Sequence, residues 1–270
     1  MAEIIQLFGI LAVSGAIAGI ISGLLGVGGG IILVPAFFYA FTTLGYVPDQ
    51  LMQICVATST GTIIFTSWRS VMSHHKRGAV DVDLIKSWGP IIAVGSIIGV
   101  FAATALRSQE LQIIFGAIGV SLGLYMLLGK KDWRLADHLP GKILSSVYAS
   151  GIGFFSALMG IGGGSFTVPL LTAYNYPPHR AVATSPGFGL AISIPGFIAF
   201  LLSGWDLEGK PPYTIGYVNI PAVILIIAMT SMTVPLGVKL AHKLSPKHLR
   251  LVFACTVLLL AGNMLRKGLF

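Results

Sequence analysis

The chain has 270 residues, of which 55% are hydrophobic and only 10% are charged, whereas a soluble domain carries about 25% charged residues. This composition excludes a soluble globular protein and indicates a polytopic membrane protein. The net charge of +8 comes from basic residues in short stretches between apolar runs, which is typical of membrane topology and does not suggest nucleic-acid binding.

Five apolar elements are expected in the first half, at residues 4–25, 31–44, 51–68, 88–106 and 111–128. A basic loop is expected at residues 69–77, between the third and fourth elements. The second element is short, so whether it crosses the membrane or re-enters it stays open. A polar stretch at 130–142 is expected to be a cytoplasmic linker, which divides the chain into transmembrane repeats at 1–129 and 143–270.

The second half follows the same plan. Apolar elements are expected at 143–159, 166–174, 181–202, 218–240 and 249–265, with a polar loop at 204–213. The element at 166–174 is again short, and it too could cross or re-enter. The expected fold class is therefore all-α, with two five-element repeats.

A glycine-rich break occurs once in each half. The segment GIISGLLGVGGGIILVP at 19–35 returns as GFFSALMGIGGGSFTVP at 153–169. Adjacent glycines interrupt a helix, since each costs about 1 kcal/mol relative to alanine. Inside a membrane such a break is tolerated only where protein buries it or where it lines a watery cavity. Paired breaks in two halves therefore indicate the binding site of a transporter, near the membrane midplane.

Two other interpretations of these glycines were weighed. Gly15, Gly19 and Gly23 are spaced by four residues, which fits a helix-packing face and explains those three. A nucleotide-binding loop is excluded, because Ile31 and Ser165 stand where a small glycine or alanine is required.

The repeat extends beyond the glycines and predicts an inverted second half. VATSTG at 56–61 matches VATSPG at 182–187, and GAVD at 78–81 matches GYVN at 216–219. Because each half has an odd number of elements, the second should be inverted, with both termini on the non-cytoplasmic side. If every element crosses, the cytoplasmic side holds most of the basic residues and the other side holds only Arg107, Lys210, Arg266 and Lys267.

The polar residues of the interior favour an anion. Every aspartate and glutamate lies in a loop or at an element end, which disfavours a cation substrate. Hydroxyls and the amides of a broken helix suit an anion instead. The candidate substrate-binding residues are Gly28, Gly29, Gly30, Thr58, Ser59, Gly162, Gly163, Gly164, Thr184, Ser185 and Arg180.

Simpler roles remain open for several of these candidates. Serine and threonine hydroxyls in membrane helices often bond to their own backbone. Arg180 could recruit an anion or could be an ordinary cytoplasmic basic residue. The sequence contains no constellation typical of an enzyme or of a metal site, so neither catalysis nor a cofactor is expected.

These motifs resemble the TauE/SafE family of sulfite and organosulfonate exporters. The resemblance rests on the doubled GxGGGxxxVP, the ATS that follows each copy, HKRGAVD at 75–81 and GYVNIPA at 216–222. One departure is Thr60 in the first half against Pro186 in the second, which puts the symmetry of the site in question.

The resemblance implies a secondary carrier that exports small sulfur-containing anions across the plasma membrane of a prokaryote. The expected partners are the anion and the lipid bilayer, with a coupling ion such as the proton and an oligomeric state both undetermined. A gated anion channel and a non-transporting membrane scaffold are the alternatives.

Overall fold

The computed structural model describes residues 2–25, 29–128, 134–241 and 246–270, so Gly28 lies outside the described residues. The regular secondary structure of the described part of the chain is helical apart from one small hairpin, as expected for an all-α membrane protein. The helices are α1 (Ala2–Leu25), α2 (Gly30–Thr43), α3 (Leu51–His75), α4 (Val82–Ala105), α5 (Ser108–Leu128), α6 (Lys142–Met159), α7 (Gly164–Ala173), α8 (Pro178–Leu202), α9 (Ile220–Ala241) and α10 (Pro246–Leu269).

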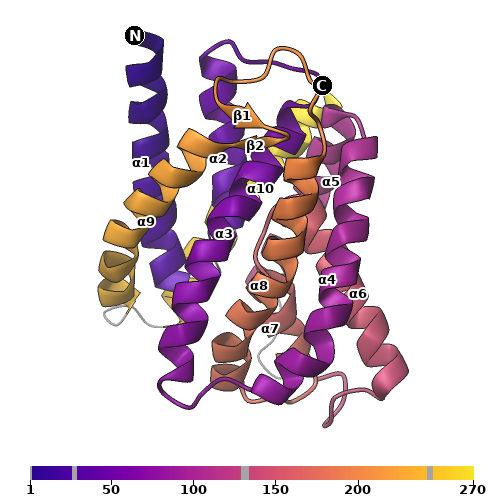
Figure 1. Ribbon diagram of the computed structural model, residues 1–270. Coiled ribbons are helices and arrows are strands. Elements are labelled where there is room, and N and C mark those ends of the chain that lie inside the picture. Colours follow the sequence, from indigo (N-terminus) through magenta and orange to yellow (C-terminus); the bar gives the residue numbers. More distant parts are fainter. Residues whose placement is uncertain (1, 26–28, 129–133, 242–245) are drawn as a thin grey trace.

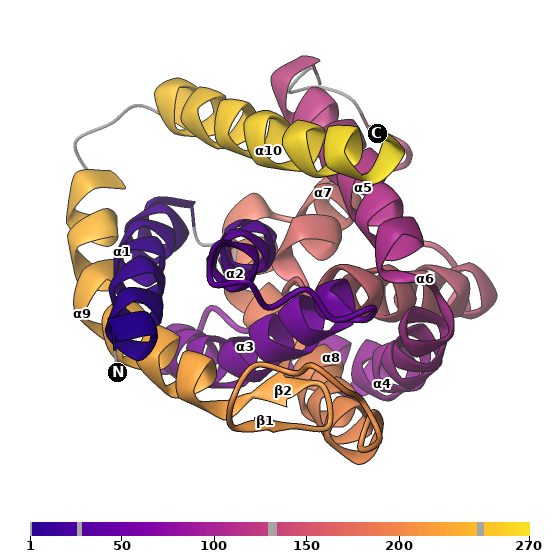
Figure 2. The same cartoon turned by 90° about the horizontal axis from the view of Figure 1, so that it is seen from above.

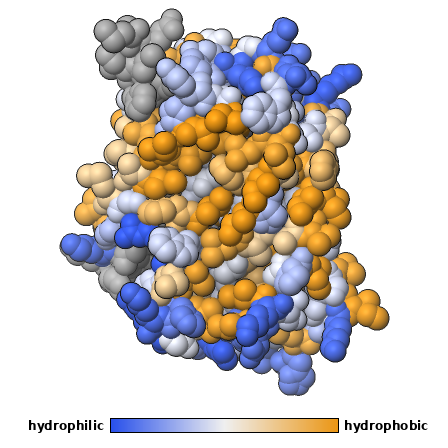
Figure 3. Space-filling model, viewed as in Figure 1, coloured by the Kyte–Doolittle hydropathy of each residue, from blue (hydrophilic) through white to orange (hydrophobic). Residues whose placement is uncertain are grey.

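The surface is that of a membrane protein. Among the described residues, five helices are long and apolar enough to cross a bilayer: α4, α5, α6, α8 and the part of α9 at 220–237. Figure 3 shows an apolar band across the middle of the face in view, with hydrophilic side chains at both ends. On α4 the large apolar side chains of Val94, Ile98 and Phe101 are exposed. Burying such side chains in lipid removes apolar area from water.

Two element boundaries differ from the sequence prediction. The helix α3 continues to His75, so Arg69 and His74 lie on a helix and not in a loop. The helix α4 begins at Val82, because Asp81 caps it by accepting a hydrogen bond from the Leu84 amide at 2.9 Å. The prediction was wrong there because it ended each helix where its hydrophobicity ended, whereas charged helical turns extend beyond the apolar span.

A second difference is the hairpin between α8 and α9. The strands β1 (Thr214–Ile215) and β2 (Val218–Asn219) pair antiparallel, whereas no strand was expected and residues 218–219 were placed at the start of the apolar element 218–240. Gly216 lies in the turn with φ of +56°, and a Cβ there would lie 2.5 Å from the carbonyl oxygen of Phe200. The glycine of the GYVN motif is therefore required both by conformation and by packing.

The helices of the two halves pack against each other. In Figures 1 and 2, α1 lies beside α9, α6 lies beside α4, and α3 and α8 lie side by side. The helix α1 begins, and α10 ends, at one end of the molecule, while α3 ends at the other. The two halves therefore form one interleaved bundle, and the division of the chain at 130–142 stays a prediction.

Small residues allow the close approach of α1 to α9. A Cβ at Gly15 would lie 2.7 Å from Ile226 Cδ1, and one at Gly19 would collide with Thr233. The packing role predicted for these two glycines is therefore confirmed, while the surroundings of Gly23 fall outside the described part. Gly153, the counterpart of Gly19, packs in the same way against Ile92 of α4.

Several contacts are reciprocal between the halves. The amide of Asn219 donates to Thr58 Oγ1 at 3.1 Å, and the amide of Asp81 donates to Thr184 Oγ1 at 3.0 Å. In the sequence alignment Thr58 matches Thr184, and Asp81 matches Asn219. Each half thus gives the other the same contact. This pattern supports the inverted repeat, which stays a prediction.

Candidate functional site

The second glycine break is the tip of an antiparallel helical hairpin. The helix α6 ends at Met159 and is capped by Gly160, whose φ of +60° is left-handed and suits glycine, and α7 begins at Gly164. At the open end of this hairpin the hydroxyls of Tyr148 and Tyr174 are 3.1 Å apart. The hairpin is therefore closed at its base by a tyrosine pair, and its tip points into the bundle.

The two breaks meet inside the protein. A Cβ at Gly30, the first residue of α2, would lie 2.5 Å from the carbonyl oxygen of Gly160. Ser59, from the middle of α3, donates to the same carbonyl at 2.7 Å. Gly29 is buried with φ of +54°. The two breaks therefore adjoin each other at Gly30 and Gly160, and Ser59 holds the second break through its hydrogen bond.

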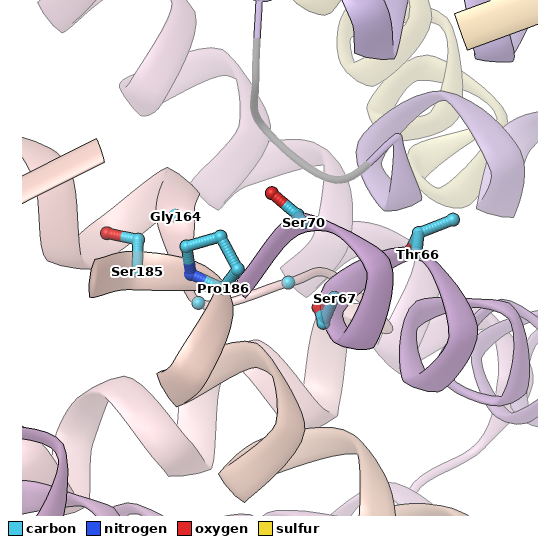
Figure 4. Close-up of a pocket in the computed structure, with 8 residues that line it drawn as sticks. Thr66, Ser67, Ser70, Gly164, Ser185 and Pro186 are labelled. Atoms are coloured by element: carbon cyan, nitrogen blue, oxygen red, sulfur yellow. The ribbon is translucent and has the colours of Figure 1, made fainter. Parts of the chain in front are cut away.

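A small cavity lies beside the second break. Its volume is about 30 Å³, and its lining residues are Thr66, Ser67, Ser70, Gly162, Gly163, Gly164, Ser185 and Pro186. Figure 4 shows the α3 hydroxyls on one side and Gly164, Ser185 and Pro186 on the other. The lining contains no charged side chain. The cavity borders the last turns of α3, the end that carries Arg69 and His74.

The N-terminus of α7 offers free hydrogen-bond donors at this cavity. The backbone amides from Gly162 to Ser165 donate to no described residue. Four unpaired amides are expected at a helix N-terminus, where the helix dipole also supplies about half a positive charge. Such an end binds anions.

Ser67 brings an unpaired hydroxyl to the same cavity. Its side chain is only 6% exposed, and it forms no hydrogen bond with any described residue. A buried polar group without a partner costs free energy, and a ligand or an ordered water usually satisfies it. The hydroxyl of Ser165, in the first turn of α7, is also buried and unpaired. The Ser67 hydroxyl and the free amides of the lining glycines together suit an oxygen-rich anion, whereas Ser165 is not among the lining residues.

Ser185 lines the cavity but already has partners. Its hydroxyl lies 2.7 Å from Thr167 Oγ1 and 2.7 Å from the Ala181 carbonyl. Thr167 in turn lies 2.7 Å from the Gly163 carbonyl. This chain of hydrogen bonds ties α7 to α8 and positions the glycines. Because each hydroxyl has only one proton, Ser185 has little hydrogen-bonding capacity left for a ligand.

Thr58 and Thr184 lie away from the lining of the cavity. Both oxygens accept backbone amides from the opposite half, those of Asn219 and Asp81. They hold in place the starts of α9 and α4. The structure therefore gives these two candidate residues a structural contact, and it does not bring them to the cavity with Gly162–Gly164.

Arg180 belongs to a polar cluster at the end of the bundle. Its Nη2 atom lies 3.5 Å from Asp81 Oδ2, and the Tyr176 hydroxyl donates to the same oxygen at 2.7 Å. Burial alone would raise the pKa of Asp81, but the hydrogen bonds from Tyr176 and the Leu84 amide and the charge of Arg180 together lower it. Burial and the bond to Asp81 raise the pKa of Tyr176 to about 12. Arg180 is not among the lining residues of the cavity.

Sequence reasoning missed the hydroxyls of α3. Thr66, Ser67 and Ser70 continue the series that starts at Thr58, with helical spacing that places them near one face. The expected end of the helix at residue 68 separated Ser70 from this series. Extending the predicted helix to residue 75 would have placed Ser70 in the same series as Thr66 and Ser67.

The sequence was compared with known proteins. Residues 11–264 match the sulfite exporter TauE/SafE family. The chain belongs to this family. A "probable membrane transporter protein" of Haemophilus influenzae is 33% identical over 94% of this chain and 96% of its own length. A "probable membrane transporter protein" of Methanocaldococcus jannaschii is 32% identical over 93% of each chain.

Other relatives agree with this placement in the TauE/SafE family. A "probable membrane transporter protein" of Bacillus subtilis is 27% identical over 97% of this chain and 99% of its own length. No solved structure matches the chain. Family membership, the related transporters and the apolar helices together make this a multi-pass membrane protein of a transporter family.

Proposed function

We propose that the protein is a secondary transporter of small sulfur-containing anions, such as sulfite, thiosulfate or the organosulfonate sulfoacetate, and that it exports them across a prokaryotic plasma membrane. The observation that carries the proposal is the cavity at the start of α7, where free backbone amides and the buried hydroxyl of Ser67 meet. Donors without a fixed negative charge fit an oxyanion and disfavour a metal cation.

Two further features support an anion substrate. The cavity adjoins the end of α3 where Arg69 is exposed, and the basic residues Lys76 and Arg77 follow. Positive charge around an entrance raises the local concentration of anions. The binding residues themselves are neutral, so an anion held by dipoles alone can also leave, which a transporter requires.

A carrier is favoured over a gated channel by the contact between the two breaks. Gly30 packs directly on Gly160, so this contact blocks passage between the two breaks. An anion that passes must wait for this contact to rearrange, as in alternating access. A non-transporting scaffold would have no need for unpaired buried donors.

Flux measurements in proteoliposomes test the proposal. Sulfite efflux should saturate with concentration and should be exchanged in counterflow, whereas an unsaturated conductance would favour the channel. Purified protein should also be stabilised against heat by sulfite, because a ligand stabilises the state it binds. If sulfite, thiosulfate and sulfoacetate give neither stabilisation nor flux, the result would favour a non-transporting membrane scaffold.

Ser67→Ala is the matched test of the site. A hydrogen bond to a charged group is worth about 1.5–3 kcal/mol, so sulfite affinity should fall by roughly one to two orders of magnitude. Ser121→Ala serves as control, because the Ser121 hydroxyl is exposed and donates to its own helix at the Ala117 carbonyl. Equal affinity in Ser67→Ala and Ser121→Ala would remove the cavity from the site.

A further inference from the structure

Ile63 separates the cavity from the first glycine break. Its side chain is 1% exposed and lies one turn before Thr66 and Ser67 on α3. Its Cδ1 atom would lie 3.3 Å from a Cβ at Gly30, and its Cγ2 atom 3.7 Å from a Cβ at Gly162. One apolar side chain thus lies beside both Gly30 at the start of α2 and Gly162 in the second break.

The equivalent position in the second half has no side chain. When the alignment of 56–61 with 182–187 is continued along the two helices, Ile63 matches Gly189. A Cβ at Gly189 would collide with Ser67 Oγ, so the glycine makes room for the cavity's unpaired hydroxyl. The same position of the repeat therefore differs between the two halves. On α8 it is a glycine, which leaves a polar recess beside α7, whereas on α3 it is an isoleucine, which fills the space beside α2.

We infer that Ile63 is the size-determining residue of the transport path. This inference rests on the proposed function and adds the residue that limits the anion. The cavity of about 30 Å³ has room for a few water molecules, so an oxyanion head group occupies all of it. Any anion that moves from the amides of α7 toward those of α2 must pass Ile63. A carbon substituent on the anion then competes with this side chain for the same space.

The close packing around Ile63 explains why its side chain alone can set the size of the anion that passes. Gly30 and Gly160 already touch through backbone atoms, so neither tip can retreat without moving its helix. A side chain can change rotamer at much lower cost than two packed helices can shift. Shortening Ile63 should therefore admit longer anions while leaving recognition of the head group at Ser67 and the α7 amides unchanged.

The test uses alkanesulfonates with one head group and a growing tail. Methanesulfonate, ethanesulfonate and propanesulfonate are compared with sulfite in proteoliposome counterflow and in thermal stabilisation of the full-length protein. In the wild type, each added carbon should reduce flux about tenfold or more, as expected for a methylene that does not fit. Ile63→Ala should reduce this discrimination about tenfold per carbon, and Ile63→Val should reduce it by a smaller factor.

Ile54→Val is the matched control. Ile54 is a fully buried isoleucine on the same helix, in its first turn, away from the cavity. It should lower thermal stability about as much as Ile63→Val and leave the ratio of propanesulfonate to methanesulfonate flux unchanged. The less disruptive Ile63→Val keeps the test decisive if Ile63→Ala gives no folded protein.

The outcomes separate the two proposals. If sulfite is transported and the ratio is the same in the wild type and both Ile63 variants, Ile63 is only a core residue and this inference is wrong. A change of equal size in Ile54→Val would overturn it too. If the wild type neither binds nor transports any of these anions, the proposed function fails, and the size filter fails with it.

Discussion

Thr184 Oγ1 accepts a hydrogen bond from the backbone amide of Asp81, at 3.0 Å, across the two halves of the chain. The same bond joins Thr58 to the amide of Asn219, at 3.1 Å. One threonine in each half therefore anchors the residue that precedes a helix of the opposite half. A substitution of either threonine is therefore expected to affect the packing of the two halves before it affects a ligand.

Thr58→Val should destabilise the protein more than Thr184→Val. The Asn219 residue is 1% exposed, so the valine would leave a buried amide without an acceptor, at a cost of about 1–3 kcal/mol. The Asp81 side is only partly buried, and water can replace the lost partner. Thermal unfolding of the purified variants measures both effects. Loss of anion binding at unchanged stability in Thr58→Val would instead place Thr58 at the ligand.

Acidification should weaken the junction of α4 with α8 through Asp81. Its pKa is lowered in the folded protein, so its contribution is present above the usual value of 3.8 and is lost as the pH falls through the folded pKa. The melting temperature of the wild type should therefore fall as the pH drops below about 4.

Asp81→Asn is the natural comparison, because the second half has Asn219 at this position, where its Oδ1 caps α9 through the Ala222 amide at 3.0 Å. The variant should keep the cap and lose this acid-dependent component. An unchanged pH profile in Asp81→Asn would assign the acid sensitivity to another group.

Gly162→Ala should weaken anion binding without loss of folded protein. Among the described residues, a Cβ at Gly162 would meet only Ile63 Cγ2, at an ordinary 3.7 Å, and would enter the cavity. A Cβ at Gly163 would lie 3.1 Å from both the Gly189 amide nitrogen and Phe188 Cβ. Gly163→Leu should therefore reduce the yield of folded protein before it affects the ligand. The measurements are gel-filtration yield and sulfite-induced stabilisation. Normal sulfite affinity in folded Gly162→Ala would contradict a site at these amides.

Cysteine labelling should place the start of α1 and the end of α3 on opposite sides of the membrane. Figure 1 places these two helix ends at opposite ends of the bundle. In intact cells, an impermeant thiol reagent should label a single cysteine that replaces Glu3. The same reagent should leave a single cysteine that replaces Lys76 unlabelled. The native Cys55 and Cys255 would first be replaced by alanine. Labelling of both positions from outside would refute the predicted topology.

The sequence was sufficient for the helices and the breaks, since both depend on local composition. Apolar runs predict spans, and three adjacent glycines end a helix wherever they occur. Helix ends such as Asp81 and His75 were misplaced because a cap or a charged turn contributes no hydrophobicity. The hairpin at Gly216 was missed because its strands are only two residues long.

The candidate site was predicted in part. The glycines of the second break do line a cavity, because a broken helix exposes its amides whatever its neighbours are. The partners of Thr58 and Thr184 could not be predicted, since each lies more than a hundred residues away in the chain. Ser67 could not be singled out either. Its importance depends on the missing side chain of Gly189, on another helix.

The packing of α1 against α9 also has a consequence for how the chain is made. The face of α1 with Gly15 and Gly19 has to meet Ile226 and Thr233, which emerge from the ribosome only when most of the chain has been synthesised. Until then this face must rest against lipid or against the insertion machinery. Assembly is therefore dominated by contacts that are distant in sequence, which form slowly. Truncation before α9 should leave α1 inserted but without its final partner, and such a chain is a natural substrate for membrane quality control.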